Sequence, residues 1–270
     1  MQDRIQESIK LKHTQQQASL IGQLSKLGCL GNADIYIEWG AGKGELSYFL
    51  YQALPPRDKA TDFLLIDRDA GRLKFDSRIM KKAQSQGQDD LVNIVRHKVD
   101  IAHIDLAKMI EVEFPGITDP IICSISKHLC GSATDLTLSC LRSYSTSRST
   151  SISLLVAVCC HQLCTWAAFS PESRTFFLNA GIQEKDFNIL CRLTSWHTSG
   201  PSAKAAKSDE AAHWTNLTYA ERSAIGWNCK RLIDSARVAS LRASGWTAEV
   251  IKYEDIEVTT ECYALLATKN

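Results

Sequence analysis

The sequence lacks any apolar run long enough to cross a membrane, and it lacks a secretory signal with a basic start and an apolar centre. Its longest apolar stretch, SLLVAVCC, falls far short of the roughly 20 residues that a membrane helix needs. We therefore expect a soluble intracellular protein, cytoplasmic or nuclear, with no membrane partner.

An excess of charge is also missing. The 270 residues include 31 Lys and Arg and 30 Asp and Glu, which gives a formal net charge of +1. No global basic field indicates a nucleic-acid partner and none excludes one, so any such surface must be local. The ten cysteines are scattered, several of them within apolar runs, and without a secretory signal we expect them to be reduced.

From Asp34 onward, short β-branched or apolar runs alternate with helical patterns, which is typical of βαβ units and a parallel sheet. Strands are predicted at 34–39, 62–67, 91–99, 120–127, 151–159, 247–253 and 262–268. Helices are predicted near 44–54, 69–84, 103–112, 132–146, 171–180, 184–194 and 218–244, the last with a capping-box pair at Thr218 and Glu221. We expect a helical extension over 1–33 that packs on the sheet, and one domain over 34–270.

The last two predicted strands decide the fold class. Only about eight residues, EDIEVTTE, join them, which is too few for a crossover helix, so the two strands should pair antiparallel. Seven strands with an antiparallel last strand are typical of the Rossmann-like class I methyltransferases that depend on S-adenosylmethionine (SAM). The sequence therefore predicts this α/β fold.

The stretch EWGAGKGE places Gly40, Gly42 and Gly44 directly after the first predicted strand. Glycine lets backbone approach a ligand where a Cβ would clash. The spacing G-x-G-x-G is one residue short of the dinucleotide fingerprint, and the P-loop pattern is absent. A glycine turn that binds no ligand is the simpler alternative.

Carboxylates end the first three predicted strands, at Glu38, Asp67 and Asp100, and the carboxyl ends of parallel strands face one crevice. Asp67 is placed for ribose hydroxyls and Asp100 for an adenine amino group, although each alone could be a solvated strand end. Together they favour SAM, which carries an ammonium and a sulfonium. The predicted cofactor-binding residues are Glu38, Gly40, Ala41, Gly42, Gly44, Asp67, Arg68, Asp100, Ile101 and Ser126.

Histidines follow the fourth and fifth predicted strands, in SKHLCG (126–131) and CCHQLC (159–164). The [ND]-P-P-[YF] turn common in amine-directed methyltransferases is absent, which favours an acceptor that needs a base or a cation near its reacting oxygen. The predicted catalytic residues are Lys127, His128 and His161. The alternatives are histidines packed at a strand end and a solvated lysine.

The cysteines beside His161 do not predict a metal site. Cys159 and Cys160 are adjacent on a strand, so their side chains should point to opposite faces. With Cys164 they form neither C-x-x-C nor a set with a second ligand pair. A nucleophilic role for Cys160 is also disfavoured, because the usual Pro-Cys or Thr-Cys context is missing.

Four segments, KHLCGSATDLTLSCL, VAVCCHQLC, LTSWHTSG and ERSAIGWNCKRLID, together closely resemble the catalytic domain of the eukaryotic tRNA 2′-O-methyltransferases that modify position 4 in the acceptor stem. The resemblance runs from about residue 34 to the C-terminus and keeps the family's motif order. It implies SAM as cofactor, tRNA as partner and methylation of a ribose 2′-hydroxyl. His161 or His128 would be the base, and Lys127 would stabilise the developing alkoxide.

Two departures from the family pattern accompany this resemblance. The family's full-length proteins carry N-terminal zinc fingers of Cys/His type, and no such pattern precedes the glycine turn, so we expect those segments to be absent from this chain. The family also tends to have a second histidine after Cys-Cys-His, where this sequence has Gln162. This sequence therefore lacks the paired histidines that a mechanism relying on both would use at this point.

An acceptor-stem substrate would be held mainly through phosphates and 2′-hydroxyls, so local cations matter more than net charge. The predicted substrate-binding residues are Trp196, His197, Arg142, Lys204 and Lys207. Further cation candidates are Arg148, Arg222, Lys230 and Arg237, although each could be a solvated surface charge and Trp196 could pack in the core. Two other functions stay open: a SAM-dependent methyltransferase of a small molecule or protein, and an inactive SAM-fold subunit that binds RNA.

Overall fold

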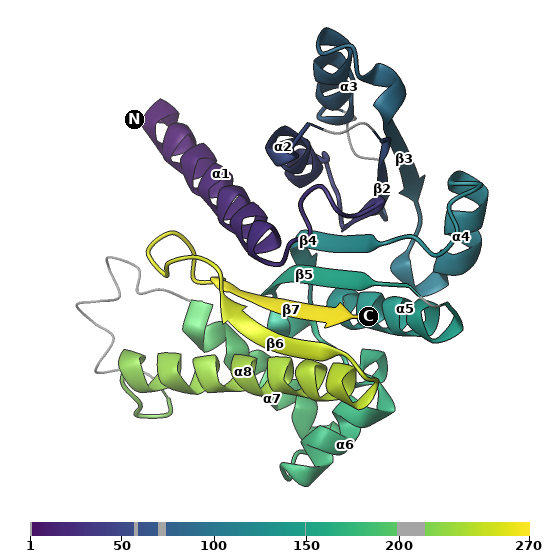
Figure 1. Ribbon diagram of the computed structural model, residues 1–270. Coiled ribbons are helices and arrows are strands. Elements are labelled where there is room, and N and C mark those ends of the chain that lie inside the picture. Colours follow the sequence, from purple (N-terminus) through teal and green to yellow (C-terminus); the bar gives the residue numbers. More distant parts are fainter. Residues whose placement is uncertain (1, 57–58, 70–73, 149, 199–213) are drawn as a thin grey trace.

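The computed structural model describes residues 2–56, 59–69, 74–148, 150–198 and 214–270, with backbone alone for residues 2–10. One seven-stranded sheet forms its centre, with helices on both faces (Figure 1). The strands are β1 (Ile35–Trp39), β2 (Thr61–Asp67), β3 (Val92–Lys98), β4 (Ile122–Cys130), β5 (Ile152–Cys159), β6 (Thr247–Lys252) and β7 (Tyr263–Lys269). The helices are α1 (Gln2–Lys26), α2 (Glu45–Ala53), α3 (Asp76–Ser85), α4 (Leu106–Glu113), α5 (Ser132–Ser147), α6 (Pro171–Asn179), α7 (Glu184–Thr198) and α8 (Tyr219–Ala243).

The strand order is β3-β2-β1-β4-β5-β7-β6. The first five strands pair in parallel, whereas β7 runs antiparallel to both β5 and β6. This confirms the predicted α/β fold with an antiparallel last strand. Strands β1 and β4 are neighbours in the sheet, and the strand order changes direction between them. In sheets of this kind, ligands bind in the crevice outside the carboxyl ends of the strands at such a point.

Alternation along the strands sorts the core into two layers. Ile35, Ile37 and Trp39 join the cluster under α4, α5 and α8, whereas Tyr36 joins the cluster under α1, α2 and α3. Successive strand side chains point to opposite faces, so Glu38 must share the Tyr36 face. That orientation sends its carboxylate toward α2.

The leading helix α1 belongs to the second layer. Its Leu20, Ile21 and Leu24 are buried in the cluster with Leu46 and Leu50 of α2. In Figure 1, α1 lies near α2 and near the loop that joins β6 to β7. Ser19 donates to Glu254 Oε2 at 2.8 Å, which ties α1 to the segment between β6 and β7. Within the described ranges, no helix combines the length and apolarity needed to cross a bilayer.

Helices α6 to α8 form a third cluster below the sheet. Phe177 of α6, Phe187 of α7 and Ile233 of α8 are completely buried there. Gly226 permits close packing, because a Cβ at this position would lie 2.5 Å from the backbone nitrogen of His197. The capping box at Thr218 and Glu221 is confirmed at the start of α8.

Several element boundaries differ from the sequence prediction. Helix α7 runs to Thr198, past its predicted end near 194, because its last turn packs against α8, so Trp196 and His197 lie in this helix. Strand β4 extends to Cys130 past a register shift between Ser126 and Leu129. Helix α3 begins at Asp76, and helix α4 begins at Leu106 after the 3-10 turn η2 (Ile101–His103).

Candidate active site

The glycine turn connects β1 to α2 and adopts a conformation that only glycine tolerates well. Gly40, Gly42 and Gly44 have φ angles of 64°, 50° and 75°, all in the left-handed region. A Cβ at Gly44 would lie 2.7 Å from Asp76 Oδ1 and 2.9 Å from Arg96 Nη2, whereas a Cβ at Gly42 would meet nothing within 4 Å. The turn is therefore closely packed on its α3 side and open at Gly42.

Two charged side chains hold this turn in place. Asp67, at the end of β2, accepts from Gly42 N at 2.7 Å and from Asp69 N at 2.8 Å. Arg96 of β3 donates to the carbonyl oxygen of Gly42 at 2.9 Å and pairs with Asp76. Each carboxylate oxygen can accept more than one hydrogen bond, so Asp67 keeps acceptor capacity toward the crevice.

Glu38 is buried behind the glycine turn and binds the first turn of α2. The side chain is 4% exposed, and its Oε2 accepts from both the backbone nitrogen and the hydroxyl of Ser47 in α2. Burial raises the pKa of Glu38 to about 7, against the lowering effect of the Ser47 hydrogen bonds and the Arg96 charge. Here Glu38 caps the first turn of α2 rather than facing the crevice.

The other predicted cofactor residues divide into crevice and interior positions. Asp100 caps η2 through Oδ1, which accepts from Ala102 N at 3.0 Å, and Ile101 lines a cavity of about 420 Å³ between η2 and α5. Arg68 is exposed directly after β2, whereas Ala41 is buried. Ser126 is completely buried and donates to the carbonyl oxygen of Trp39 at 2.7 Å, so it ties β4 to β1.

Lys127 and His128 occupy the irregular part of β4 directly beside the glycine turn. The carbonyl oxygen of His128 lies 3.5 Å from the position that a Cβ on Gly40 would take. Lys127 Nζ lies 3.2 Å from His13 Nδ1 of α1, and the His13 and His128 rings meet edge to face at 6.2 Å. Sequence patterns did not indicate that α1 supplies a histidine here, because its residues show only helical spacing.

Burial and neighbouring charges shift the pKa of both Lys127 and His128. Burial lowers the pKa of Lys127, opposed by the charges of Glu45 and Glu38. His128 keeps an exposed surface, yet burial of part of its ring and the charges of Lys127 and His13 lower its pKa to about 4. The imidazole of His128 is therefore neutral at neutral pH.

His161 lies in the interior instead. It begins the short helix η3 (His161–Leu163), is 1% exposed, and its Nε2 donates to Asp234 Oδ1 of α8 at 2.9 Å. Burial lowers its pKa against the effect of Asp234. Asp234 also pairs with Arg237 at 3.0 Å, and Arg237 pairs with Asp135 of α5. Of the two histidines predicted as base candidates, the structure exposes only His128.

The cysteines at the ends of β4 and β5 are not arranged as the strand pattern predicts. Cys160 has a φ of 51°, which breaks the alternation, so Cys159 and Cys160 do not point to opposite faces. Their sulfurs and that of Cys130 all lie within 4.8 Å of one another. The side chain of Cys164, by contrast, is buried beside Arg237.

The predicted substrate residues are distributed over several elements. Trp196 and His197 are half-buried in α7, where His197 Nδ1 lies 3.2 Å from Ser223 Oγ. Arg142 lines a cavity of about 610 Å³, but its guanidinium is bound by Glu172 and Ser240. Lys204 and Lys207 lie outside the described residues.

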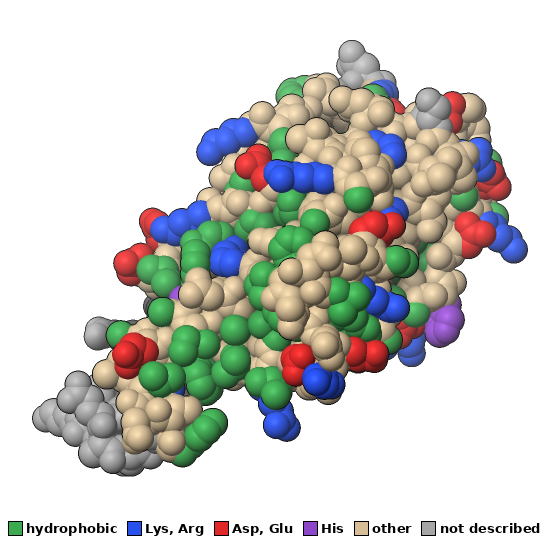
Figure 2. All heavy atoms as spheres, turned by 90° about the horizontal axis from the view of Figure 1, so that it is seen from below, with side chains coloured by type: hydrophobic (Ala, Val, Ile, Leu, Met, Phe, Trp, Pro, Cys, Tyr) green, Lys and Arg blue, Asp and Glu red, His purple; other side chains and the backbone are tan. Residues whose placement is uncertain are grey.

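The further cation candidates are also engaged within the protein. Arg148 pairs with Glu111. Arg222, Lys230 and Arg237 of α8 are 7%, 3% and 1% exposed, so they do not form a phosphate-binding surface. On the face shown in Figure 2, which lies below the view of Figure 1, basic and acidic side chains are interspersed with hydrophobic ones.

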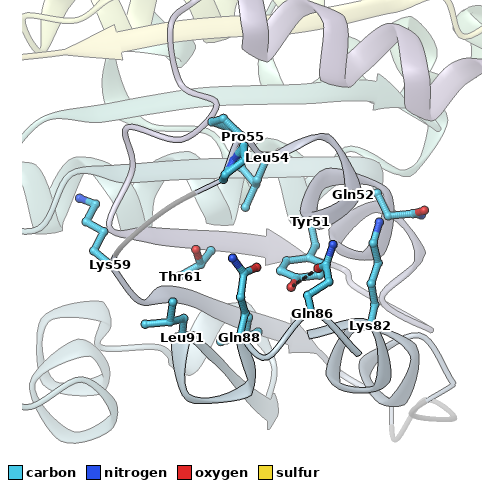
Figure 3. A pocket seen from close by; sticks show the side chains of 12 residues that line it. Tyr51, Gln52, Leu54, Pro55, Lys59, Thr61, Lys82, Gln86, Gln88 and Leu91 are labelled. Atoms are coloured by element: carbon cyan, nitrogen blue, oxygen red, sulfur yellow. Dashed lines mark hydrogen bonds between the residues drawn. The ribbon is translucent and has the colours of Figure 1, made fainter. Parts of the chain in front are cut away.

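A separate cavity of about 150 Å³ lies at the opposite ends of the strands, where β2 and β3 begin (Figure 3). Its lining includes Thr61 and Val92, at the amino ends of β2 and β3, together with Tyr51 and Lys82. None of the predicted catalytic or cofactor residues lines it. The candidate active site is therefore the crevice at the carboxyl ends of β1, β2 and β4.

The sheet order, the antiparallel β7 and the glycine turn held by Asp67 define the fold of a class I methyltransferase. Over residues 15–268 the sequence matches the protein family described as Methyltransferase TRM13. The chain belongs to this family.

Curated relatives carry the name "tRNA:m(4)X modification enzyme TRM13". The protein from Schizosaccharomyces pombe is 36% identical over 272 residues, which cover 100% of this chain and 71% of the relative. The protein from Debaryomyces hansenii is 33% identical over 288 residues, covering 100% and 62%, and that from Saccharomyces cerevisiae is 30% identical over 302 residues, covering 96% and 63%. This chain thus spans about two thirds of the length of these relatives.

Solved structures resemble the chain only distantly. The methyltransferase domain of bacterial CtHen1 covers 95% of this chain and 98% of its own length, with 12% sequence identity and a TM-score of 0.42. The fold assignment consequently rests on the sheet topology and the family match.

Proposed function

We propose that this chain transfers a methyl group from SAM to a ribose 2′-hydroxyl at position 4 of a tRNA acceptor stem. The names of its relatives support a tRNA substrate, and the four motifs that resemble the 2′-O-methyltransferases support the ribose oxygen. The observation that carries the proposal is the position of His128. His128 is exposed, and its backbone carbonyl oxygen lies beside Gly40 of the glycine turn.

The residues of the crevice fit SAM. Gly42 leaves open the space that a side chain would fill, and Asp67 and Asp100 supply acceptors at the ends of adjacent strands for ribose hydroxyls and an amino group. Val99 N donates to the carbonyl oxygen of Asp67 at 2.9 Å, which fixes the ends of β2 and β3 relative to each other. When bound, SAM supplies an electrophilic methyl group on its sulfonium.

His128 is the residue that we assign as the base. A 2′-hydroxyl is a weak acid, so a neighbouring group that accepts its proton accelerates the attack. His128 can reach a substrate because it is exposed, whereas the Nε2 of His161 is committed to Asp234 inside the protein. Lys127 provides a positive charge beside the developing alkoxide and is held by His13.

Binding of the tRNA is assigned to local groups rather than to the net charge of the protein, which is +1. A-form RNA offers phosphates and 2′-hydroxyls rather than readable base edges. Trp196 and His197 on α7 and the segment that contains Lys204 and Lys207 remain our candidates for these contacts. Arg142 is a weaker candidate, because a phosphate would have to displace Glu172.

The test is incubation of the protein with SAM and unmodified tRNA, followed by mapping of 2′-O-methyl groups at nucleotide resolution. We expect one methyl group on an acceptor-stem ribose, at position 4. Methylation confined to a base, a protein or a small molecule would refute the proposal. The variant His97→Gln serves as a control, because His97 lies on β3 and pairs with Glu113, outside the crevice.

A further inference from the structure

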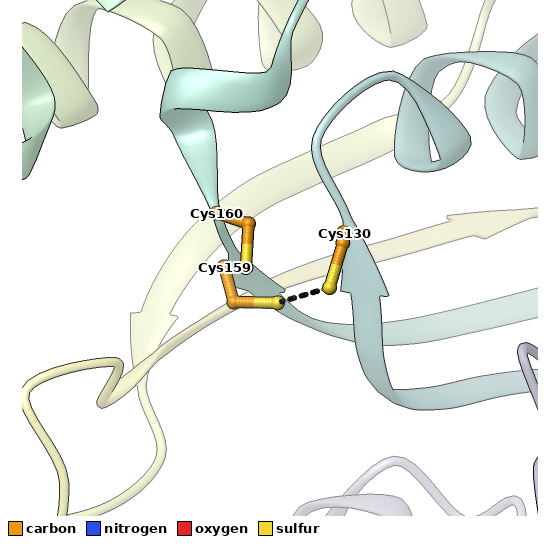
Figure 4. A group of neighbouring side chains, drawn as sticks. All are labelled: Cys130, Cys159 and Cys160. Carbon is orange, nitrogen blue, oxygen red and sulfur yellow. Dashed lines mark hydrogen bonds between the residues drawn. The ribbon is translucent and has the colours of Figure 1, made fainter. Parts of the chain in front are cut away.

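Three cysteine side chains converge at the carboxyl ends of β4 and β5, beside the candidate active site. Figure 4 shows Cys130 at the end of β4 facing Cys159 at the end of β5, with Cys160 directly beyond. The register shift in β4 produces this arrangement. Ser126 pairs with Val156, but after the irregularity Leu129 pairs with Val158, so Cys130 comes to lie opposite Cys159.

The backbone of Cys160 brings in the third sulfur. On a regular strand its side chain would point away from that of Cys159. Its φ of 51° and ψ of 41° are left-handed instead, a conformation that costs a residue with a Cβ roughly 1–2 kcal/mol. The fold thus maintains an unfavourable backbone geometry at the residue that completes the cluster, which is common at functional positions.

The sulfur positions suit a small metal ion. The Sγ atoms of Cys130 and Cys159 are 3.6 Å apart, and all three Sγ atoms lie within 4.8 Å of one another. A tetrahedral zinc ion with Zn–S bonds of about 2.3 Å requires ligand sulfurs about 3.8 Å apart. Small rotations of the side chains would bring the three thiols to that spacing.

The site is accessible from solvent. Cys130 is exposed and Cys160 is half-buried, so an ion can reach the thiols. His161 and Cys164 are not part of the set, because they bind Asp234 and Arg237.

We propose that Cys130, Cys159 and Cys160 form a site for a thiophilic divalent metal ion, with Zn²⁺ as the favoured occupant and one coordination position open toward the crevice. Binding replaces the three thiol protons by three metal–sulfur bonds, and the protons pass to solvent. The site is independent of the proposed methyl transfer, and its test does not require activity.

The experiment measures binding of the metal alone to the whole chain under reducing conditions. Metal-free protein is titrated with Co²⁺, whose bonds to thiolates give intense charge-transfer absorption, and then with Zn²⁺ in competition. We expect one equivalent of Co²⁺ to bind with this absorption, and Zn²⁺ to displace it.

Substitutions identify the ligands. Removal of a metal's outer partners already weakens binding about 10–100-fold, so Cys130→Ser should weaken it by more than about 100-fold. Cys160→Ser gives a second test at a half-buried position, and circular dichroism verifies that both variants fold. Cys140→Ser is the matched control, since Cys140 is half-buried outside the cluster, next to the carbonyl oxygen of Ile104.

Two results would overturn the proposal. One is the absence of thiolate-to-metal absorption in the parent protein. The other is equal affinity in the parent and in folded Cys130→Ser and Cys160→Ser variants, which would place the ion on other residues.

Discussion

His161 Nε2 donates to Asp234 Oδ1 at 2.9 Å, and the two side chains are 0% and 1% exposed. The bond joins the segment after β5 to α8. Arg237 extends the connection to α5 by pairing with both Asp234 and Asp135. The histidine of the Cys-Cys-His motif thus belongs to a buried ionic network that holds α8 against the sheet.

Replacement of His161 should therefore act on stability first. We expect His161→Ala to lower the free energy of unfolding by about 2–4 kcal/mol, because it leaves a cavity and removes a hydrogen bond from a buried carboxylate. Urea unfolding followed by circular dichroism measures this loss. Unchanged stability combined with lost methyl transfer would instead assign His161 to catalysis.

His128→Ala, unlike His161→Ala, should reduce methyl transfer and leave stability nearly unchanged. His128 is exposed, so the free energy of unfolding should change by less than about 0.5 kcal/mol, as for most surface substitutions. Methyl transfer to tRNA should fall by about 100-fold or more, the usual contribution of a general base. Single-turnover assays with saturating SAM and tRNA measure the rate, with His97→Gln as the control. A rate within a few fold of the parent would exclude His128 as the base.

Much of the fold follows from local sequence patterns. The alternating strands, the glycine turn and the short EDIEVTTE connection each report on residues close in sequence, so all seven strands and the antiparallel pairing of β6 and β7 were predictable. The capping box was predictable for the same reason, since its two hydrogen bonds span only three residues.

The site depends more on contacts between distant segments, which spacing does not encode. Regular alternation cannot anticipate the irregularity at Lys127 and His128 or the left-handed backbone of Cys160. Polarity suggested that Lys230 and Arg237 face solvent, but their carboxylate partners, Glu261 and Asp135, come from other elements. Burial of such pairs is decided by tertiary packing.

The crossing of α7 and α8 gives a prediction about packing. Gly226→Ala places a Cβ 2.5 Å from His197 N and 2.9 Å from Leu193 O, and backbone atoms cannot move aside cheaply. We expect a loss of about 1–3 kcal/mol in the free energy of unfolding.

Gly22→Ala provides the matched control for this substitution. Gly22 lies inside α1, and a Cβ there meets nothing within 4 Å, so alanine should stabilise the protein by about 0.5–1 kcal/mol through helix propensity. Thermal or urea unfolding of the two variants compares them directly. Equal effects of the two substitutions would show that close packing at Gly226 does not limit stability.

Glu38 gives a prediction about pH. Burial raises its pKa from the ordinary 4.5 to about 7, so between these pH values the folded chain holds a proton that the unfolded chain has released. Unfolding in this window releases that proton, and the free energy of unfolding must fall as pH rises. The contribution of protonated Glu38 is complete near pH 4.5 and below, and it is lost as pH rises through about 7.

Glu38→Gln should remove this dependence. The amide oxygen can still accept from Ser47, but it carries no charge, so the variant should gain stability relative to the parent as pH rises, by up to about 3 kcal/mol at pH 8. Urea unfolding from pH 4.5 to 8, without SAM, measures the two slopes. Glu249→Gln, on the exposed face of β6, should leave the parent's slope unchanged. Parallel curves for Glu38→Gln and the parent would mean that Glu38 stays ionised in the folded protein, stabilised by Ser47 and Arg96 against its burial.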